Sequence, residues 1–339
     1  MKKVLQIDGG GIRGIIPAII LSYLEEKCGK PLCQCFDLIT GTSTGAIIGG
    51  AIAASVPASQ IRDLYINKGK ALFTPRTRLN PRNWIRGKYD QRPFIEEMAK
   101  QLGKNHGGLN TPLGELTLAD LNSRFMATAF NLSSQRTHFI KSWDPEGRDT
   151  KYKVVNVIAW SALSAVYYFD KINVPEFKWN DYQVNELDSL PHLEKQGAVF
   201  QDGGQGVHNN TLGYVLTEIL ANRWTQEELY ILSLGTGGQD EYIPYETVAQ
   251  FRITEQLKSY LLCQARREST INQVLAAHYV SSQANPNENP HITFKRIDKV
   301  LDNKDEDGLD KVEYIKNYQQ YGNDLINQIK PEDIELLKS

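Results

Sequence analysis

The residues best suited to chemistry lie in Gly41-Thr42-Ser43-Thr44-Gly45, a G-x-S-x-G element. An apolar run at 36–39 precedes it and small, apolar residues follow at 46–54, so we expect a strand, a sharp turn and a helix. A serine on such a turn projects its hydroxyl away from the backbone, and the following helix directs its positive dipole end at a developing oxyanion. We therefore predict that Ser43 is a nucleophile.

A second candidate element is Asp8-Gly9-Gly10-Gly11-Ile12-Arg13-Gly14, which joins the first expected strand to its helix. Its glycine spacing fits a dinucleotide-binding fingerprint, but that fold needs an acidic residue where this chain has the serine turn. Consecutive glycines also allow backbone N–H groups to approach an acyl oxygen. We predict an oxyanion hole in this loop, beside Ser43; a plain tight turn is the alternative.

The third element, Asp202-Gly203-Gly204, directly follows the expected strand Ala198–Gln201. It would place a carboxylate at a strand end, with two glycines that permit a sharp reversal of the chain. Most such tripeptides are simple turns, so this element gains its weight from the other two.

Strand and helix signals alternate at the start of the chain, and this order implies an α/β fold with a parallel sheet and helices on its faces. We expect a strand at Val4–Ile7, a helix at Ile15–Glu26, a strand at Phe36–Thr40 and a helix at Thr44–Ser55. Helical spacing continues at 58–72 and 93–102, and further strands are expected at 125–130, 137–140, 198–201 and 229–234. Ser43 would then lie at the carboxyl edge of the sheet.

No repeat or low-complexity linker divides the 339 residues, so we expect one domain over 1–339. The motifs occupy about 1–240, and the remainder, about 241–339, has helical composition, with long helices expected at 247–282 and a helix from Val312. The segments 103–114 and 284–290 are expected to be loops.

The formal net charge of −2 gives no global attraction to nucleic acid or to an anionic membrane. The longest apolar run, near 15–21, is shorter than the roughly 20 residues that cross a bilayer, and Asp8 interrupts any signal peptide. We expect a cytoplasmic protein, peripheral at the membrane if it acts there. The four cysteines have the spacing of neither a disulfide framework nor a zinc site, so no metal is expected.

These three elements, in this order, resemble the patatin-like phospholipase family, whose pattern is D-G-G-G-x-[KR]-G, then G-x-S-x-G, then D-G-[GA]. Asn209-Asn210 resembles the asparagines that follow the family's D-G-G, and Leu232–Gly237 resembles its late strand and glycine turn. The resemblance covers about residues 1–240 and implies a three-layer α/β/α fold with a mostly parallel central sheet.

The resemblance implies a lipid acyl hydrolase that works through a Ser-Asp dyad and an acyl-enzyme, without a cofactor. It assigns Ser43 as nucleophile, Asp202 as general base and the backbone of Gly9, Gly10 and Gly11 as oxyanion hole. Arg13 matches the family's basic residue, which either supports the oxyanion or braces the turn. The remaining matched motif positions are glycines, namely Gly14, Gly41, Gly45, Gly203 and Gly204.

A conventional triad would need a histidine after the aspartate, and His208, His278 and His291 follow it in the chain. None of them lies in a recognisable motif, so we favour the dyad.

The resemblance implies phospholipids or lysophospholipids as substrates. Some bacterial patatin-like proteins are effectors of cyclic-nucleotide anti-phage signalling, which would make a small cyclic nucleotide an activating partner. The alternative is a patatin-like binding or storage protein with incidental esterase activity. The loop after Asp202 is longer than in the family pattern, and 161–169 follows that pattern only loosely, so the acyl-chain preference stays open.

Two further segments suggest contacts with ions or lipids. A cluster of basic residues surrounds Trp84 and Ile85 without an acidic residue between them, a pattern suited to phospholipid headgroups at a membrane surface, or to a solvated loop; its members are Arg76, Arg78, Arg82, Arg86 and Lys88. The segment 303–308 resembles the front of a calcium loop, but Tyr314 occupies the position of the required glutamate, so we expect a solvated acidic turn.

Overall fold

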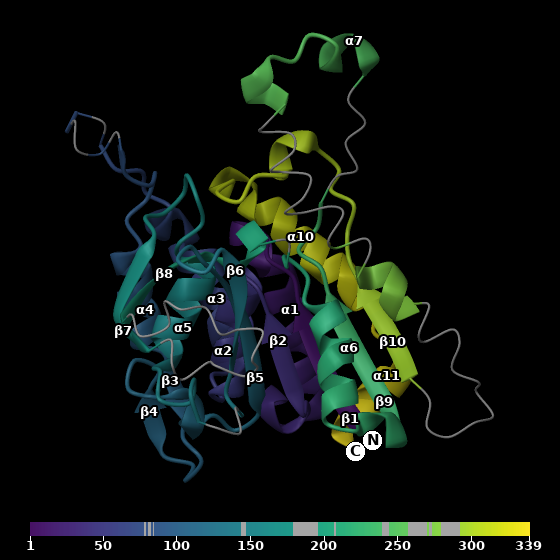
Figure 1. Cartoon of the computed structure of the whole chain (residues 1–339). Helices are drawn as coiled ribbons and strands as arrows, with labels where there is room; N and C mark the ends of the chain where they lie inside the picture. Colours follow the sequence, from purple (N-terminus) through teal and green to yellow (C-terminus); the bar gives the residue numbers. More distant parts are fainter. Residues whose placement is uncertain are drawn as a thin grey trace.

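The computed structural model of the chain describes residues 1–77, 79–80, 83, 85–143, 147–178, 196–206, 208–238, 244–256, 270, 273–278 and 292–339. Within these residues the central element is an eight-stranded sheet in the order β10-β9-β1-β2-β5-β8-β7, with β6 also paired to β5 (Figure 1). Its strands are β1 (Lys2–Ile7), β2 (Leu38–Gly41), β5 (Arg124–Asn131), β6 (Arg136–Lys141), β7 (Ile172–Lys178), β8 (Gln196–Asp202), β9 (Leu229–Leu234) and β10 (Ile292–Ile297). The helices are α1 (Ile15–Cys28), α2 (Thr44–Ala53), α3 (Ala58–Leu72), α4 (Arg92–Ala99), α5 (Val154–Ala162), α6 (Leu212–Ala221), α7 (Tyr245–Val248), α10 (Ile315–Ile326) and α11 (Pro331–Lys338).

The centre of the sheet is parallel, as the alternation of strands and helices predicts. β1 pairs in parallel with β2 and β9, which in turn pair in parallel with β5 and β10. β6, β7 and β8 join through antiparallel pairs. The expected mostly parallel sheet is therefore confirmed, and it carries an antiparallel border.

Helices cover both faces of this sheet. Successive strand residues point to opposite faces, so Leu5 and Ile7 belong to a large core with α1, α2, α3, α5, α10 and α11, while Val4 belongs to a smaller core with α6. The three-layer α/β/α architecture is confirmed by these two cores.

β5 determines where two important strand ends meet. One edge of β5 pairs with β2 as far as Ala127, opposite Gly41, and with β8 from Ala129, opposite Asp202. β6 occupies the other edge along 126–131, so β2 and β8 share one edge. Because β8 runs antiparallel to β5, the carboxyl ends of β2 and β8 point toward each other across two residues of β5, about 7 Å.

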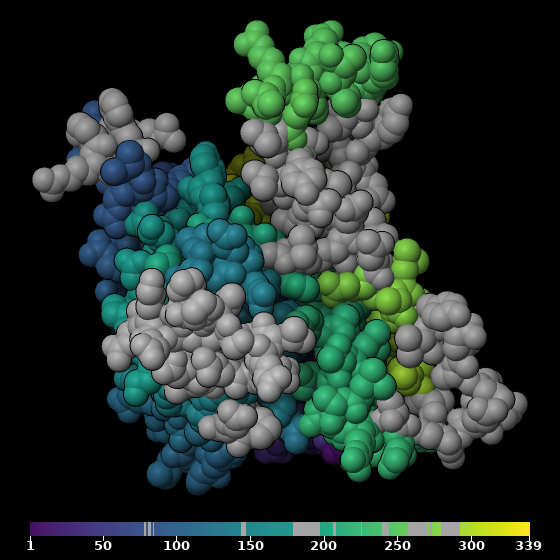
Figure 2. All heavy atoms as spheres, in the orientation of Figure 1, coloured from purple at the N-terminus to yellow at the C-terminus, as the bar shows by residue number. Residues whose placement is uncertain are grey.

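The structure departs from the expected elements in several places. The segment 103–114, expected as a loop, contains a hairpin of β3 (Leu102–Lys104) and β4 (Asn110–Pro112). The unpredicted elements α5, β7 and β10 are short, and short apolar runs fit helix and strand patterns equally. Of the long helices expected at 247–282, the described residues are helical up to 248 and at 253–256, 270 and 273–278, whereas 249–252 form a turn and irregular backbone. The remaining residues of this range lie outside the described ones. α7 stands apart from the three layers, at the top of the view (Figures 1 and 2).

The C-terminal helices share the large core with the motif-bearing part of the chain. Tyr318 and Leu325 of α10 and Leu337 of α11 pack in the same cluster as the buried face of α1. Gly322 lets α10 approach α1 closely, because a Cβ there would lie 2.9 Å from Cβ of Ile19. We propose on this basis that the chain forms one domain. Over the ranges that the structure describes, every helix is too short or too polar to span a bilayer.

Candidate active site

The serine turn places Ser43 in a strained backbone conformation between β2 and α2. Its φ of 54° and ψ of −126° are unusual for a residue with a side chain, as expected of a nucleophile elbow. A Cβ on Gly41 would overlap the backbone of Gly45, and a Cβ on Gly45 would overlap the carbonyl oxygen of Ile7. Both flanking glycines are therefore required for the turn to pack against β1.

Asp202 is the second buried polar residue at this edge, with a relative exposure of 4%. Its Oδ1 accepts a hydrogen bond of 2.8 Å from the backbone N–H of Gly204. Burial raises the pKa of Asp202 to about 7, although the Gly204 N–H and the Ser43 hydroxyl act in the opposite direction. The structure thus brings Ser43 and Asp202 together, as the converging ends of β2 and β8 require.

The other carboxylate oxygen, Oδ2, is buried and accepts no hydrogen bond from any residue that the structure describes. A buried acceptor of this kind is costly unless a partner reaches it. A carboxylate with a pKa near 7 and one open oxygen has the properties of a general base at neutral pH.

The aspartate turn is held against the sheet by close backbone packing. A Cβ on Gly203 would overlap the Thr128 side chain and lie 2.5 Å from the Thr128 carbonyl oxygen. The amide oxygen of Asn209 lies close to the Cα positions of Gly9 and Gly204, where an added Cβ on either residue would meet it. Asn209 therefore joins the aspartate turn to the glycine-rich loop.

The glycine-rich loop lies beside the serine, since a Cβ on Gly9 would be 3.1 Å from Cβ of Ser43. The N–H of Gly9 donates to the carbonyl oxygen of Asn209 at 3.1 Å, and its own carbonyl accepts from Thr236 Oγ1 at 2.8 Å. The N–H groups of Gly10 and Gly11 donate to no backbone carbonyl oxygen within the described ranges. They are the better placed of the three predicted oxyanion donors.

Gly11 needs its lack of a side chain for two reasons. Its φ is +60°, and a Cβ would overlap the carbonyl oxygen of Leu309, which also accepts from the N–H of Ile12 at 2.8 Å. Gly14 leaves space for the side chain of Thr44 at the start of α2. The loop therefore contacts both the serine turn and the C-terminal part of the chain.

Arg13 is buried, and its side chain braces this loop. Its Nε donates to the carbonyl oxygen of Thr236 at 3.1 Å, its Nη1 donates to that of Gly308 at 3.3 Å, and Nη1 lies 3.1 Å from Oδ1 of Asp307. These contacts favour the structural role of Arg13 over direct oxyanion support.

A buried polar network that the motif analysis missed holds the base of the loop. Asp8 accepts from the amide groups of Gln6 at 2.9 Å and Asn210 at 2.8 Å, and from Arg296 at 2.5 Å. Arg296 lies on β10, about 290 residues from its partner, so no local pattern indicates the pairing. Asn210, which the sequence indicated only as a family feature, links Asp8 to α6, because the N–H of Leu212 donates to its Oδ1 at 2.9 Å.

The candidate triad histidines face other groups. His208 packs its ring against Phe139 and Tyr214, and burial lowers its pKa. His278 packs against Phe294 with ring centroids 4.7 Å apart. Neither hydrogen-bonds Ser43 or Asp202 in the described part of the chain, and His291 lies outside it.

A narrow apolar pocket of about 20 Å³ opens at Ser43. Its walls come from α2, α3, α4 and the segment after α5, and they include Ile47, Tyr65, Phe94, Leu163 and Phe169. Leu309 also lines it, beside Gly11. The lining suits a hydrocarbon chain, while the volume is that of about one water molecule.

Metal-ligating side chains do not gather in groups of three or more among the described residues. In the calcium-like segment, Asp307 pairs with Arg13, and Asn303 Oδ1 accepts from the N–H of Asp305 at 3.0 Å. The Asn303 side chain therefore stabilises the turn, and the Asp307 carboxylate pairs with Arg13.

A model of patatin-like phospholipases matches residues 5–215, a range that contains all three motifs. The chain belongs to the patatin-like phospholipase family. The resemblance predicted from the motifs is thereby confirmed, and the family is one of lipid hydrolases.

Three named relatives show how similar this patatin-like chain is to other proteins in sequence. It is 32% identical over 171 residues to a cGAMP-activated phospholipase of Pseudomonas aeruginosa, covering 49% of this chain and 47% of that protein. A cGAMP-activated phospholipase of Escherichia coli is 26% identical over 257 residues, covering 70% and 63%. Patatin-17 of Solanum cardiophyllum is 31% identical over 188 residues, covering 50% and 43%. The patatin-like chain thus spans less than two thirds of the length of these relatives.

Proposed function

We propose that the protein is a phospholipid acyl hydrolase that works through a dyad of Ser43 and Asp202. The observation that carries this proposal is the meeting of β2 and β8 on one edge of β5. It sets a strained serine beside a buried carboxylate whose pKa is about 7. A binding or storage protein would need neither group in this arrangement.

In the proposed reaction, Asp202 accepts the hydroxyl proton of Ser43 as the serine Oγ attacks the ester carbonyl carbon. The N–H groups of Gly10 and Gly11 donate to the oxyanion, and the positive end of α2 adds to its stabilisation. The proton then passes to the leaving alcohol. A water molecule, deprotonated by the same carboxylate, then attacks the acyl carbon. The bond to Ser43 Oγ breaks, the proton returns from Asp202 to this oxygen, and the fatty acid is released.

The decisive experiment compares the wild type with Ser43→Ala and Asp202→Asn on defined phospholipids and lysophospholipids. We expect both variants to lose about three orders of magnitude in kcat. Asp63→Asn removes an exposed carboxylate of α3 and is the matched control, with unchanged kcat. Equal activity in all four proteins would favour the binding or storage alternative.

We propose that the segment 75–90 contacts the membrane. Among its described residues, Leu79 and Ile85 are 94% and 93% exposed. Arg86 and Lys88 add cations, which pair with Asp170 and Asp310 in this structure. Arg78, Arg82 and Trp84 lie outside the described residues. Ile85→Ser should weaken sedimentation with anionic liposomes while sparing hydrolysis of a soluble short-chain ester, and unchanged sedimentation would discard this contact.

We propose activation by a cyclic nucleotide, on two grounds. Relatives from Pseudomonas aeruginosa, Escherichia coli and Vibrio cholerae are named cGAMP-activated phospholipases, and the pocket at Ser43 is too narrow for an acyl chain before it widens. A panel of cyclic nucleotides, with cGAMP included, should raise phospholipid hydrolysis. Full activity without nucleotide, and no binding of any member of the panel, would contradict this.

A further inference from the structure

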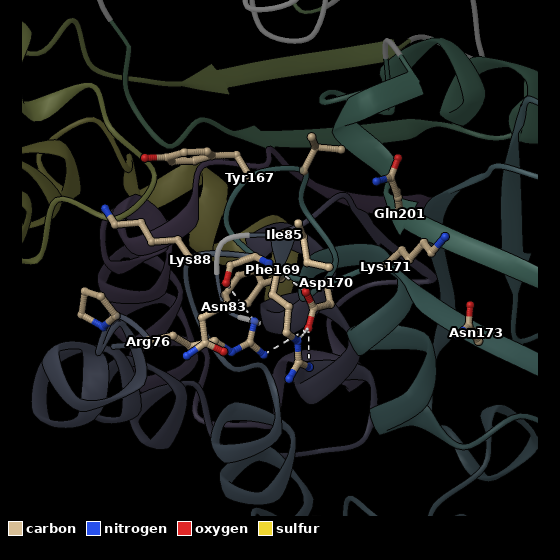
Figure 3. A pocket seen from close by; sticks show the side chains of 14 residues that line it. Arg76, Asn83, Ile85, Lys88, Tyr167, Phe169, Asp170, Lys171, Asn173 and Gln201 are labelled. Carbon is tan, nitrogen blue, oxygen red and sulfur yellow. Dashed lines mark hydrogen bonds and ion pairs between the residues drawn. The ribbon is translucent and has the colours of Figure 1, made fainter. Parts of the chain in front are cut away.

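A second and much larger cavity has a volume of about 1020 Å³ (Figure 3). It shares Phe169 with the lining of the pocket at Ser43. Described residues within 75–88, residues after α5, Asn173 of β7 and Gln201 near the end of β8 line the large cavity. This volume is at the upper end of the range of small-molecule sites. The residue that it shares with the pocket at Ser43 makes it a candidate site for the part of the substrate that is not cleaved.

The segment after α5 separates the two cavities, and its residues line them on opposite sides. Ala165 and Tyr168 line the narrow apolar pocket, whereas Val166 and Tyr167 line the large cavity. Phe169 belongs to both linings, so one ring forms part of a shared wall.

The large cavity carries positive charge, in contrast to its neighbour. Four cationic side chains line it with one carboxylate, and they are Arg76, Arg86, Lys88 and Lys171 with Asp170. The dashed contacts in Figure 3 join the two arginines to that carboxylate, with N–O distances of 3.1 Å from Arg76 and 2.6 Å from Arg86. Arg76 also lies 3.7 Å from Oδ1 of Asp90, which does not line the cavity. These carboxylates hold the guanidinium groups in place, and the lining itself keeps four cations against one carboxylate.

The two lysines add to this charge from opposite sides of the cavity. The ammonium group of Lys88 pairs with Asp310 at 2.5 Å. Lys171 precedes β7, is exposed, and donates no side-chain hydrogen bond to the residues that the structure describes. The amides of Asn173 and Gln201 lie on the same wall as Lys171 and supply further donors.

We propose that this cavity binds the phosphate-bearing headgroup of a phospholipid whose acyl chain enters the pocket at Ser43 once that pocket widens, and that it selects anionic headgroups over zwitterionic ones. An amphiphilic substrate needs two adjoining sites of opposite chemistry, and the segment 165–169 separates two such sites. Guanidinium groups bind phosphate through paired N–H donors, and a field from several cations repels the ammonium end of a choline headgroup. The inference rests on the proposed hydrolase activity and names its substrate class.

The test compares kcat/KM for dihexanoyl-phosphatidylglycerol and dihexanoyl-phosphatidylcholine, both below their micelle concentrations so that membrane binding plays no part. We expect the wild type to prefer the glycerol headgroup, and the ratio of the two values to fall about tenfold in Lys171→Glu and severalfold in Lys171→Ala. Lys178→Glu reverses an exposed charge at the far end of the same strand and should keep the wild-type ratio. An unchanged ratio in Lys171→Glu overturns the proposal.

A binding measurement separates this proposal from the hydrolase proposal. Calorimetric titration of dihexanoyl-phosphatidylglycerol into Ser43→Ala and into Ser43→Ala/Lys171→Glu should show weaker binding to the double variant, even if the wild type cleaves no phospholipid. Inorganic phosphate and cGAMP are the other phosphate sources, and they are titrated in parallel. If Lys171→Glu weakens binding of one of these but leaves lipid binding unchanged, the cavity does not hold a lipid headgroup.

Discussion

The serine turn and the aspartate turn both follow a strand end and both contain close-packed glycines, yet they acquire their chemistry in different ways. At the serine turn, Gly41 and Gly45 allow backbone contacts that force Ser43 into its positive φ. At the aspartate turn, burial beside β5 raises the pKa of Asp202. Backbone geometry thus positions the nucleophile, whereas burial by the surrounding residues raises the pKa of the proposed base.

The largest expected effect tests the backbone side of this comparison. Gly45→Ala would push a Cβ into the carbonyl oxygen of Ile7, so we expect a loss of about 3 kcal/mol or more in the free energy of unfolding. Gly213→Ala on α6 is the matched control, because its Cβ would find only ordinary contacts, at 3.6 Å or beyond, and should change stability by less than about 1 kcal/mol. Urea denaturation measures both, and equal stabilities would show that the serine turn tolerates a side chain.

The next effect tests whether Asp202, with its raised pKa, is the base. Since only the deprotonated carboxylate accepts the serine proton, kcat/KM for a soluble ester should rise about tenfold per pH unit below 7 and level off above it. A histidine base would give a similar dependence of kcat/KM on pH, so His208→Asn is the control. This variant should keep both the activity and the rise of kcat/KM below pH 7. If the rise of kcat/KM below pH 7 disappears in His208→Asn, the titrating base is the histidine.

The smallest effect concerns stability. The folded pKa of Asp202 lies above its ordinary value of 3.8, so the folded state binds more protons between about pH 4 and pH 7, and stability falls as pH rises across this range. Asp202→Asn mimics the neutral form and should raise the free energy of unfolding at pH 8 by on the order of 2 kcal/mol. This gain should shrink toward pH 5, as shown by urea denaturation at the two pH values. An equal gain in the free energy of unfolding at both pH values would show that the gain does not arise from the charge of Asp202.

Much of the site was predictable because its signals are local. The glycines at 41 and 45 are needed for contacts within one strand, turn and helix, so the spacing alone indicates an elbow. Arg13 could not be assigned from its motif, because its partners at Thr236, Asp307 and Gly308 come from distant parts of the chain. The same holds for Asp8 and Arg296, which no local pattern connects.

The sequence by itself determined the parallel α/β core, the patatin-like motifs and Ser43 as the candidate nucleophile, since each depends on contacts between near neighbours in the chain. Only the tertiary structure decided the rest. The edge of β5 sets how far Asp202 lies from the serine turn, burial sets its pKa, and the segment after α5 divides an apolar pocket from a cationic cavity. The physical reason is that desolvation and cavity shape depend on which distant segments pack together, and no spacing along the chain encodes that directly.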